Sequence, residues 1–160
     1  MPETAEFLAE RLVSEGKKTI QFLQELPEQA WAQTIYTDGA AWTVTQILAH
    51  FTTTESSLYR LLENIIGGGS GSPEDFNINA YNERKAAQLD GTPISILLEQ
   101  FLQQRQQTAA YVNRLSAHDL ERQGRHPFLG IAPVREIVKI IYRHNQIHQR
   151  EIRRALGTAE

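Results

Sequence analysis

The sequence has no cysteine among its 160 residues. A disulfide bond is therefore excluded, and no thiolate of this chain can serve as a metal ligand. Any transition-metal site has to be built from imidazole nitrogens and carboxylate oxygens, a donor set that suits zinc, nickel or iron. The absence of cysteine thus restricts the candidate metals to those that bind nitrogen and oxygen ligands.

Long apolar runs and long basic runs are also missing. The longest apolar runs fall far short of the roughly 20 residues that span a bilayer, and residues 1–6 lack a basic leader region. The formal net charge is −3, from 16 Lys and Arg against 19 Asp and Glu, and no basic stripe carries stacking aromatic residues. We therefore expect a cytoplasmic protein that contacts neither membranes nor nucleic acid.

Apolar residues are abundant enough for one core. A hydrophobic content of 41% in 160 residues predicts a single domain over residues 1–160. Apolar residues recur at helical spacing in four long segments, near residues 3–26, 44–66, 92–115 and 133–156. A short helix fits within residues 75–89, and strand signals are almost absent. The sequence predicts an all-α four-helix bundle with a long connection between its second and third long helices.

Local signals indicate where these helices begin and end. Thr43 followed by Gln46 predicts a capping box at the start of the second helix, and Pro93 is expected at the first position of the third. The glycine-rich residues 67–71 are typical of a mobile loop. Residues 36–39 and 124–130 are expected to be loops as well.

Two histidines interrupt the apolar face of the last helix. His144 and His148 lie four residues apart, on the face that also carries Ile137, Ile141 and Ile152. Side chains at this spacing stack one turn apart, close enough to hold one ion. Asn145 follows the first histidine where a zinc protease motif has Glu. The alternative is a buried histidine pair that is satisfied by hydrogen bonds.

A third histidine lies on the second helix. His50 falls on the shoulder of an apolar face, next to Ile47 and Leu61 on the helical wheel, and from there it can point toward a neighbouring helix. A half-exposed surface histidine would fit the same periodicity. Because three of the five histidines lie on or beside faces that point into the bundle, we favour a shared site.

Two segments of the sequence resemble the DinB/YfiT-like superfamily. Residues 41–50 (AWTVTQILAH) are similar to the opening of its second helix. Residues 126–130 (HPFLG), a proline-opened helix and the pair His144 and His148 are similar to its last helix. The helix lengths and the long second connection agree too, so the resemblance covers most of the chain.

The resemblance implies a four-helix bundle that binds one metal ion, commonly nickel or zinc, through residues corresponding to His50, His144 and His148. Three protein ligands leave an open coordination position, as in catalytic sites. Members of the family are often transferases or isomerases that use a low-molecular-weight thiol cosubstrate, such as bacillithiol, mycothiol or glutathione. The metal would then lower the pKa of a thiol that comes with the cosubstrate.

Acidic residues near the histidines are candidates for a supporting role. Many family members carry an acid directly after the first histidine of the pair, where this sequence has Asn145. Glu55, on the apolar face of the second helix, and Glu151, one turn after His148, could orient an imidazole or act as a catalytic base. The alternatives are Glu55 buried against Tyr or Arg and Glu151 paired with an arginine. His126 is a possible fourth ligand or a histidine that packs a loop.

The leading functional hypothesis is a metalloenzyme of the DinB type that acts on a small-molecule substrate. It would be a thiol-dependent transferase or isomerase, or a hydrolase that uses metal-activated water. A bundle with a structural ion that serves as a binding or sensor module is the non-enzymatic alternative. A homodimeric interaction protein is a third class, because bundles often pair through an exposed helix face.

Overall fold

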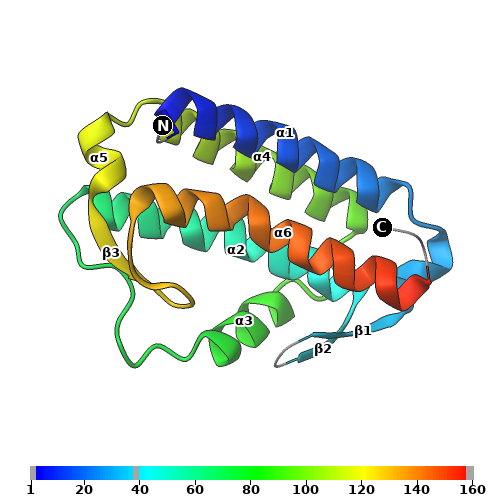
Figure 1. The fold of residues 1–160 in the computed structure, drawn as a ribbon. Helices are drawn as coiled ribbons and strands as arrows, with labels where there is room; N and C mark the ends of the chain where they lie inside the picture. The colour runs from blue at the N-terminus through cyan, green and yellow to red at the C-terminus, as the bar shows by residue number, and fades with distance from the viewer. Residues whose placement is uncertain (1–2, 38–39, 158–160) are drawn as a thin grey trace.

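Four long helices form the body of the molecule. The computed structural model describes residues 3–37 and 40–157. Its long helices are α1 (Ala5–Gln24), α2 (Val44–Ile66), α4 (Ile94–Asn113) and α6 (Val134–Leu156). Helices α1 and α2 each pack against both α4 and α6, so α1 and α2 are diagonally opposed (Figure 1). The prediction of a four-helix bundle is confirmed. No described helix has the length and apolarity needed to cross a membrane.

Capping residues set the starts of the long helices. At α2 the Thr43 hydroxyl accepts from the Gln46 backbone N–H at 3.2 Å, and the Gln46 side chain accepts from the Thr43 N–H at 2.8 Å. The predicted capping box is therefore present. The position predicted for Pro93 is wrong by one residue, because Pro93 has an extended ψ of 143° and the helix begins at Ile94.

Two short hairpins replace segments that the sequence predicts as loops. Strands β1 (Thr34–Thr37) and β2 (Ala40–Thr43) pair antiparallel, as do β3 (Gln123–His126) and β4 (Gly130–Pro133). The predicted loops at residues 36–39 and 124–130 are therefore wrong where they overlap these strands; Asp38 and Gly39 lie outside the described residues. Strands of four residues are too short to show the alternation that identifies a strand.

The connection between α2 and α4 spans residues 67–93 and carries α3 (Ile78–Ala87), which packs against α2. Its glycine-rich part, predicted as a mobile loop, is tied to β3. Ser70 O accepts from the Arg125 N–H, and the Ser72 N–H donates to Arg125 O, each at 2.8 Å. Gly71 between them has φ +91°, and an added Cβ would collide with the Arg125 backbone. This contact brings the connection and the β3–β4 hairpin together.

A polar layer divides the core of the bundle into two apolar clusters. One cluster includes Leu12, Leu62 and Ile137, and the other includes Phe51, Phe101 and Ile152. Buried polar residues occupy the intervening turns on all four long helices: Glu15, Thr19, Thr52, Glu55, Arg105, Thr108, Asn145 and Gln149. Short helix α5 (Ala117–Glu121) and 3-10 turn η1 (Glu28–Ala32) lie in the connections between the larger elements.

Candidate metal centre

His50 lies inside the molecule, with 4% of its surface exposed. Its ring packs against the Trp42 side chain, with ring centroids 4.8 Å apart, and against the imidazoles of α6. Because these rings cover the shoulder of the apolar face, the alternative of a half-exposed surface histidine is wrong. The capping box at Thr43 fixes the start of α2 two turns earlier, which sets the direction of His50.

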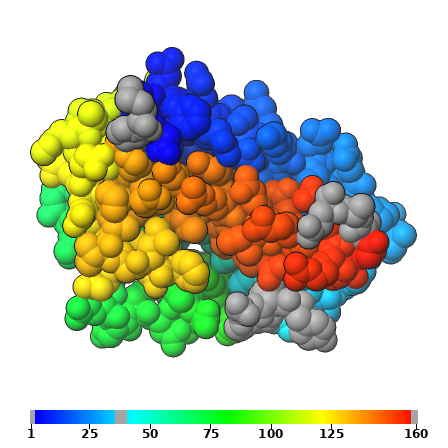
Figure 2. Space-filling view, in the orientation of Figure 1, coloured from blue at the N-terminus to red at the C-terminus, as the bar shows by residue number. Residues whose placement is uncertain are grey.

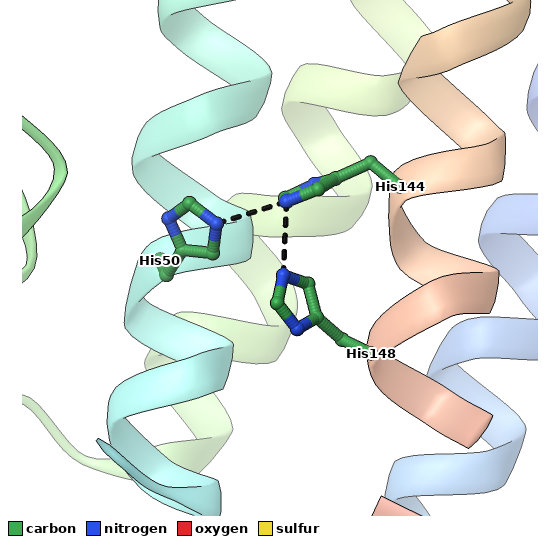
Figure 3. A group of neighbouring side chains, drawn as sticks. All are labelled: His50, His144 and His148. Carbon is green, nitrogen blue, oxygen red and sulfur yellow. Dashed lines mark hydrogen bonds between the residues drawn. The ribbon is translucent and has the colours of Figure 1, made fainter. Parts of the chain in front are cut away.

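Three imidazoles from α2 and α6 converge through their Nε2 atoms (Figure 3). His144 Nε2 lies 2.9 Å from His50 Nε2 and 3.1 Å from His148 Nε2. The His144 ring is nearly perpendicular to both neighbours, at 83° and 87°. The structure thus brings together the three histidines that the sequence singled out.

This arrangement fits a bound transition-metal ion. Each Nε2 of a neutral imidazole offers either one N–H or one lone pair, so hydrogen bonding alone would make His144 Nε2 share that single group between His50 and His148. Metal–nitrogen bonds of about 2.0–2.1 Å in a tetrahedral shell place the nitrogens about 3.3 Å apart. The observed spacings at His144 are within a few tenths of an ångström of that value.

The second nitrogens of two of these rings face oxygen atoms. His148 Nδ1 lies 2.7 Å from a carboxylate oxygen of Glu151, and His50 Nδ1 lies 3.3 Å from the Thr54 hydroxyl. Oxygen partners of this kind orient metal-binding histidines and increase their basicity. Glu151 therefore lies beside His148, within one helical turn of it on the same helix.

Glu55 is engaged elsewhere. Both of its carboxylate oxygens accept from Arg105, at 2.6 and 2.9 Å, and Glu55 is 2% exposed. Its expected role beside a histidine or as a base is therefore wrong in this structure, and the alternative of burial against an arginine is correct. Asn145 belongs to the same network, because its side-chain oxygen accepts from Arg105.

Burial keeps the three histidines neutral. It lowers the pKa of His50 to about 3, with a smaller effect from His148. Burial also lowers the pKa of His144 well below its usual value. The pKa of His148 is lowered by burial too, although the Glu151 carboxylate opposes the shift. Neutral imidazole is the form that binds metal, so the site is set up for coordination at neutral pH.

A cavity of about 860 Å³ adjoins the three histidines. Its walls come from α2, from the connection that carries α3, from the β3–β4 hairpin and from α6. Figure 2 shows an opening between the yellow-orange hairpin and the green connection. The lining includes His50, His144 and His148 together with apolar side chains such as Trp42, Phe76 and Ile147. A ligand in this cavity can reach the Nε2 cluster.

Residues 2–152 match the sequence model of the DinB superfamily. The chain belongs to this superfamily. No curated protein is significantly similar to the sequence, so solved structures supply the relatives of this DinB protein.

Three solved structures share the fold. YfiT from Bacillus subtilis, described as a probable metal-dependent hydrolase with an unusual four-helix bundle topology, has a TM-score of 0.75 and 17% identity over 97% of this chain and 89% of its own. The colibactin self-resistance protein ClbS, in complex with double-stranded DNA, has a TM-score of 0.75 and 14% identity over 100% and 99%. A mutant of the mycothiol-dependent maleylpyruvate isomerase has a TM-score of 0.69 and 14% identity over 92% and 59%. At these identities the similarity establishes the fold.

His126 does not join the three-histidine cluster of the DinB protein. It ends β3 and is 7% exposed, and its Nδ1 accepts from the backbone N–H groups of Phe128 and Leu129 at 3.0 and 3.1 Å. The expectation that it packs a loop is correct in that it holds the hairpin turn. The role of a fourth ligand is not supported, since His126 is not grouped with the other three.

Arg105 lies near the site and was not predicted from the sequence. It is fully buried and binds partners on the other three long helices. A signal for it was present, because Arg105 lies between Phe101 and Thr108 at helical spacing on the apolar face of α4. A long cation on a buried face requires an acid nearby, and Glu55 was the acid on the facing helix.

Proposed function

We propose that this DinB protein is a metal-dependent enzyme that binds one divalent transition-metal ion, with nickel and zinc as the fitting candidates, through His50, His144 and His148. The substrate would be a small molecule bound in the adjoining cavity. The observation that carries the proposal is the convergence of three Nε2 atoms at the wall of a cavity of about 860 Å³.

The number of donors favours catalysis over a purely structural ion. Structural zinc sites are closed by four protein ligands, whereas catalytic sites keep one position open. Among the described residues, the group that could hold an ion consists of three histidines, and their cavity side is open to a ligand. A purely structural ion would not need an open coordination position.

A bound ion would supply Lewis-acid chemistry, by lowering the pKa of a thiol or water or by polarising a carbonyl. The chain's own residues have separate tasks. The three neutral imidazoles hold the ion, and Glu151 orients His148. The apolar side chains around the cavity exclude bulk water, which strengthens electrostatic interactions within it.

Two reaction classes fit this site. Thiol-dependent transfer or isomerisation requires a thiol cosubstrate, since the chain has no cysteine, and the solved mycothiol-dependent isomerase shares the fold. Hydrolysis requires only water, and YfiT, described as a probable hydrolase, shares the fold as well. The structure of ClbS contains double-stranded DNA. We do not favour DNA binding for this chain, because its net charge of −3 opposes contact with phosphates.

Metal content tests the proposal directly. Protein produced with added nickel or zinc should contain about one ion per chain by plasma mass spectrometry, and His144→Ala should lose it with the helical circular dichroism retained. Ile147→Ala is the matched control, because Ile147 lines the same cavity from the same helix but offers no donor. Wild-type protein without stoichiometric metal would show that the proposal is wrong.

Titration with thiols separates the two reaction classes. Glutathione, bacillithiol and mycothiol would each be titrated into metal-loaded and metal-free protein by calorimetry. Tight binding of one thiol to the loaded form alone supports thiol-dependent chemistry. Failure of all three thiols, together with turnover of a chromogenic ester by the loaded form, supports hydrolysis.

A further inference from the structure

His126 is a buried side chain whose Nε2 atom forms no hydrogen bond with any residue that the structure describes. The inward-facing positions of β3 are Gly124 and His126, and His126 is 7% exposed. His126 lines the same cavity as the three-histidine cluster. The hairpin that carries it forms one side of the opening seen in Figure 2.

Hydrogen bonds set the tautomer of His126. Nδ1 accepts from the Phe128 N–H at 3.0 Å and from the Leu129 N–H at 3.1 Å. An accepting Nδ1 carries a lone pair, so the neutral ring has its proton on Nε2. Burial lowers the pKa of His126 to about 4, and a cation would place a second proton between the two backbone donors. Nε2 is therefore a fixed hydrogen-bond donor at neutral pH.

No described residue accepts this donor. Three nearby polar groups of the cavity wall are engaged with one another: the Tyr81 and Ser57 hydroxyls lie 2.7 Å apart, and Arg60 contacts Tyr81. A donor that leaves water and finds no acceptor costs free energy, so a ligand that displaces water from this wall has to bring an acceptor.

We propose that the Nε2–H of His126 binds an oxygen acceptor of the substrate, a carbonyl or carboxylate group, beside the three-histidine centre. The inference rests on the proposed function in taking the cavity as the substrate site. The substrate would then be a molecule with an apolar body and an oxygen atom that accepts a hydrogen bond. His126 is then a substrate-binding residue that leaves metal affinity unchanged.

Two substitutions separate the roles of the two ring nitrogens. His126→Asn places an amide oxygen near the position of Nδ1, so it keeps an acceptor for the Phe128 and Leu129 N–H groups and removes the cavity donor. His126→Gln extends an amide N–H toward the position of Nε2 and restores a donor. Metal content and circular dichroism of both variants should match the wild type.

Benzamide and toluene serve as probes, since they have similar apolar bodies but only benzamide has a carbonyl acceptor. In calorimetric or NMR titrations, His126→Asn should weaken benzamide binding about tenfold, which corresponds to one lost hydrogen bond. Toluene binding should be unchanged, and His126→Gln should recover part of the affinity for benzamide. In the wild type, ¹⁵N NMR at pH 7 should show His126 protonated on Nε2, with that signal shifted by benzamide.

Equal benzamide affinity in the wild type and His126→Asn, an Nδ1-protonated His126, or failure of the wild type to bind benzamide would each overturn the inference. The titrations are run on metal-free and zinc-loaded protein. Absence of metal binding would reject the proposed function, while the metal-free titration would still decide the role of His126.

Discussion

Arg105 and Glu55 form a two-point ion pair in the middle of the bundle. Nε and Nη2 of Arg105 donate to the two carboxylate oxygens of Glu55, and the side chains are 0% and 2% exposed. Arg105 also donates to Leu12 O and to the Asn145 side chain. One guanidinium thus links α1, α2, α4 and α6. Because Asn145 adjoins His144, the network ties α6 to α2 at the level of the histidines.

Removing the cation from this network should strongly destabilise the fold. Arg105→Leu leaves the Glu55 carboxylate buried without a partner, and we expect a loss of about 3–5 kcal/mol in the free energy of unfolding. Urea denaturation checks this value. Arg150→Leu, on the exposed face of α6, should change stability by less than about 0.5 kcal/mol. If Arg105→Leu cost as little as this control, the network would not hold the helices together.

The pair can be tested further by removing both charges. Arg105→Leu combined with Glu55→Leu leaves no buried charge, so the double variant should be more stable than Arg105→Leu alone. Its metal content then reports whether the network positions the histidines. A double variant that is stable but binds metal more weakly indicates a positioning role, whereas unchanged metal affinity indicates a role in stability alone.

Acid should destabilise the metal-free protein through its histidines. The unfolded chain protonates His50 near its ordinary pKa of 6.5, whereas the folded protein does so near 3. Between these values only the unfolded state takes up the proton, so the free energy of unfolding should fall by up to about 1.4 kcal/mol per pH unit as pH decreases below 6.5.

Urea denaturation from pH 5 to 7.5, with a chelator present, measures this dependence. Carboxylate contributions cancel in the difference between wild type and His50→Phe, and that variant should show the shallower slope. His118→Gln, on the surface, should follow the wild type. Parallel curves for the wild type and His50→Phe would show that burial does not depress the pKa of His50.

Glu151 should strengthen metal binding through His148. Its carboxylate lies 2.7 Å from His148 Nδ1, and the loss of such a partner typically lowers metal affinity 10- to 100-fold, as a rough range. Competition with a chromogenic chelator would measure the change in Glu151→Ala. Glu136→Ala, near the start of the same helix, should retain wild-type affinity. Equal metal affinities of Glu151→Ala and Glu136→Ala would show that Glu151 does not support metal binding.

Close packing of the hairpin on α2 should make an added methyl group at Gly124 unfavourable. A Cβ at Gly124 would lie 2.5 Å from Cδ1 and Cγ1 of Ile65. Gly124→Ala should therefore cost about 1–3 kcal/mol and shift the NMR signals of His126. Gln123→Ala, at the exposed neighbouring position, is the control. An undisturbed His126 signal in Gly124→Ala would contradict the packing.

Helical periodicity predicted the four long helices because each buries a face that recurs over many turns. The bounds of α2 agree with the prediction because both ends carry local signals: the capping box at Thr43 and glycine after Ile66. The hairpins could not be predicted in this way. The β1–β2 hairpin packs against α6, and the β3–β4 hairpin packs against α2 and pairs with Gly71 through Arg125. These contacts join distant parts of the chain.

The three site histidines could be predicted from the sequence because they lie on or beside the buried faces of two helices. The roles of Glu55 and Glu151 depend on which side chains each carboxylate contacts in the folded bundle, and a helical wheel of one helix does not show these contacts. Glu55 faces Arg105 on another helix, whereas Glu151 reaches His148 on its own. The tautomer of His126 depends on a turn that local sequence signals did not show.

X-ray absorption spectroscopy of the zinc-loaded protein would show whether three imidazoles bind the ion. We expect one zinc per chain with three imidazole nitrogens at about 2.0–2.1 Å and at least one further light-atom ligand at the open position. His50→Ala should reduce the imidazole count to two. Absence of stoichiometric zinc, or fewer than three imidazole ligands in the wild type, would show that His50, His144 and His148 do not form a metal site.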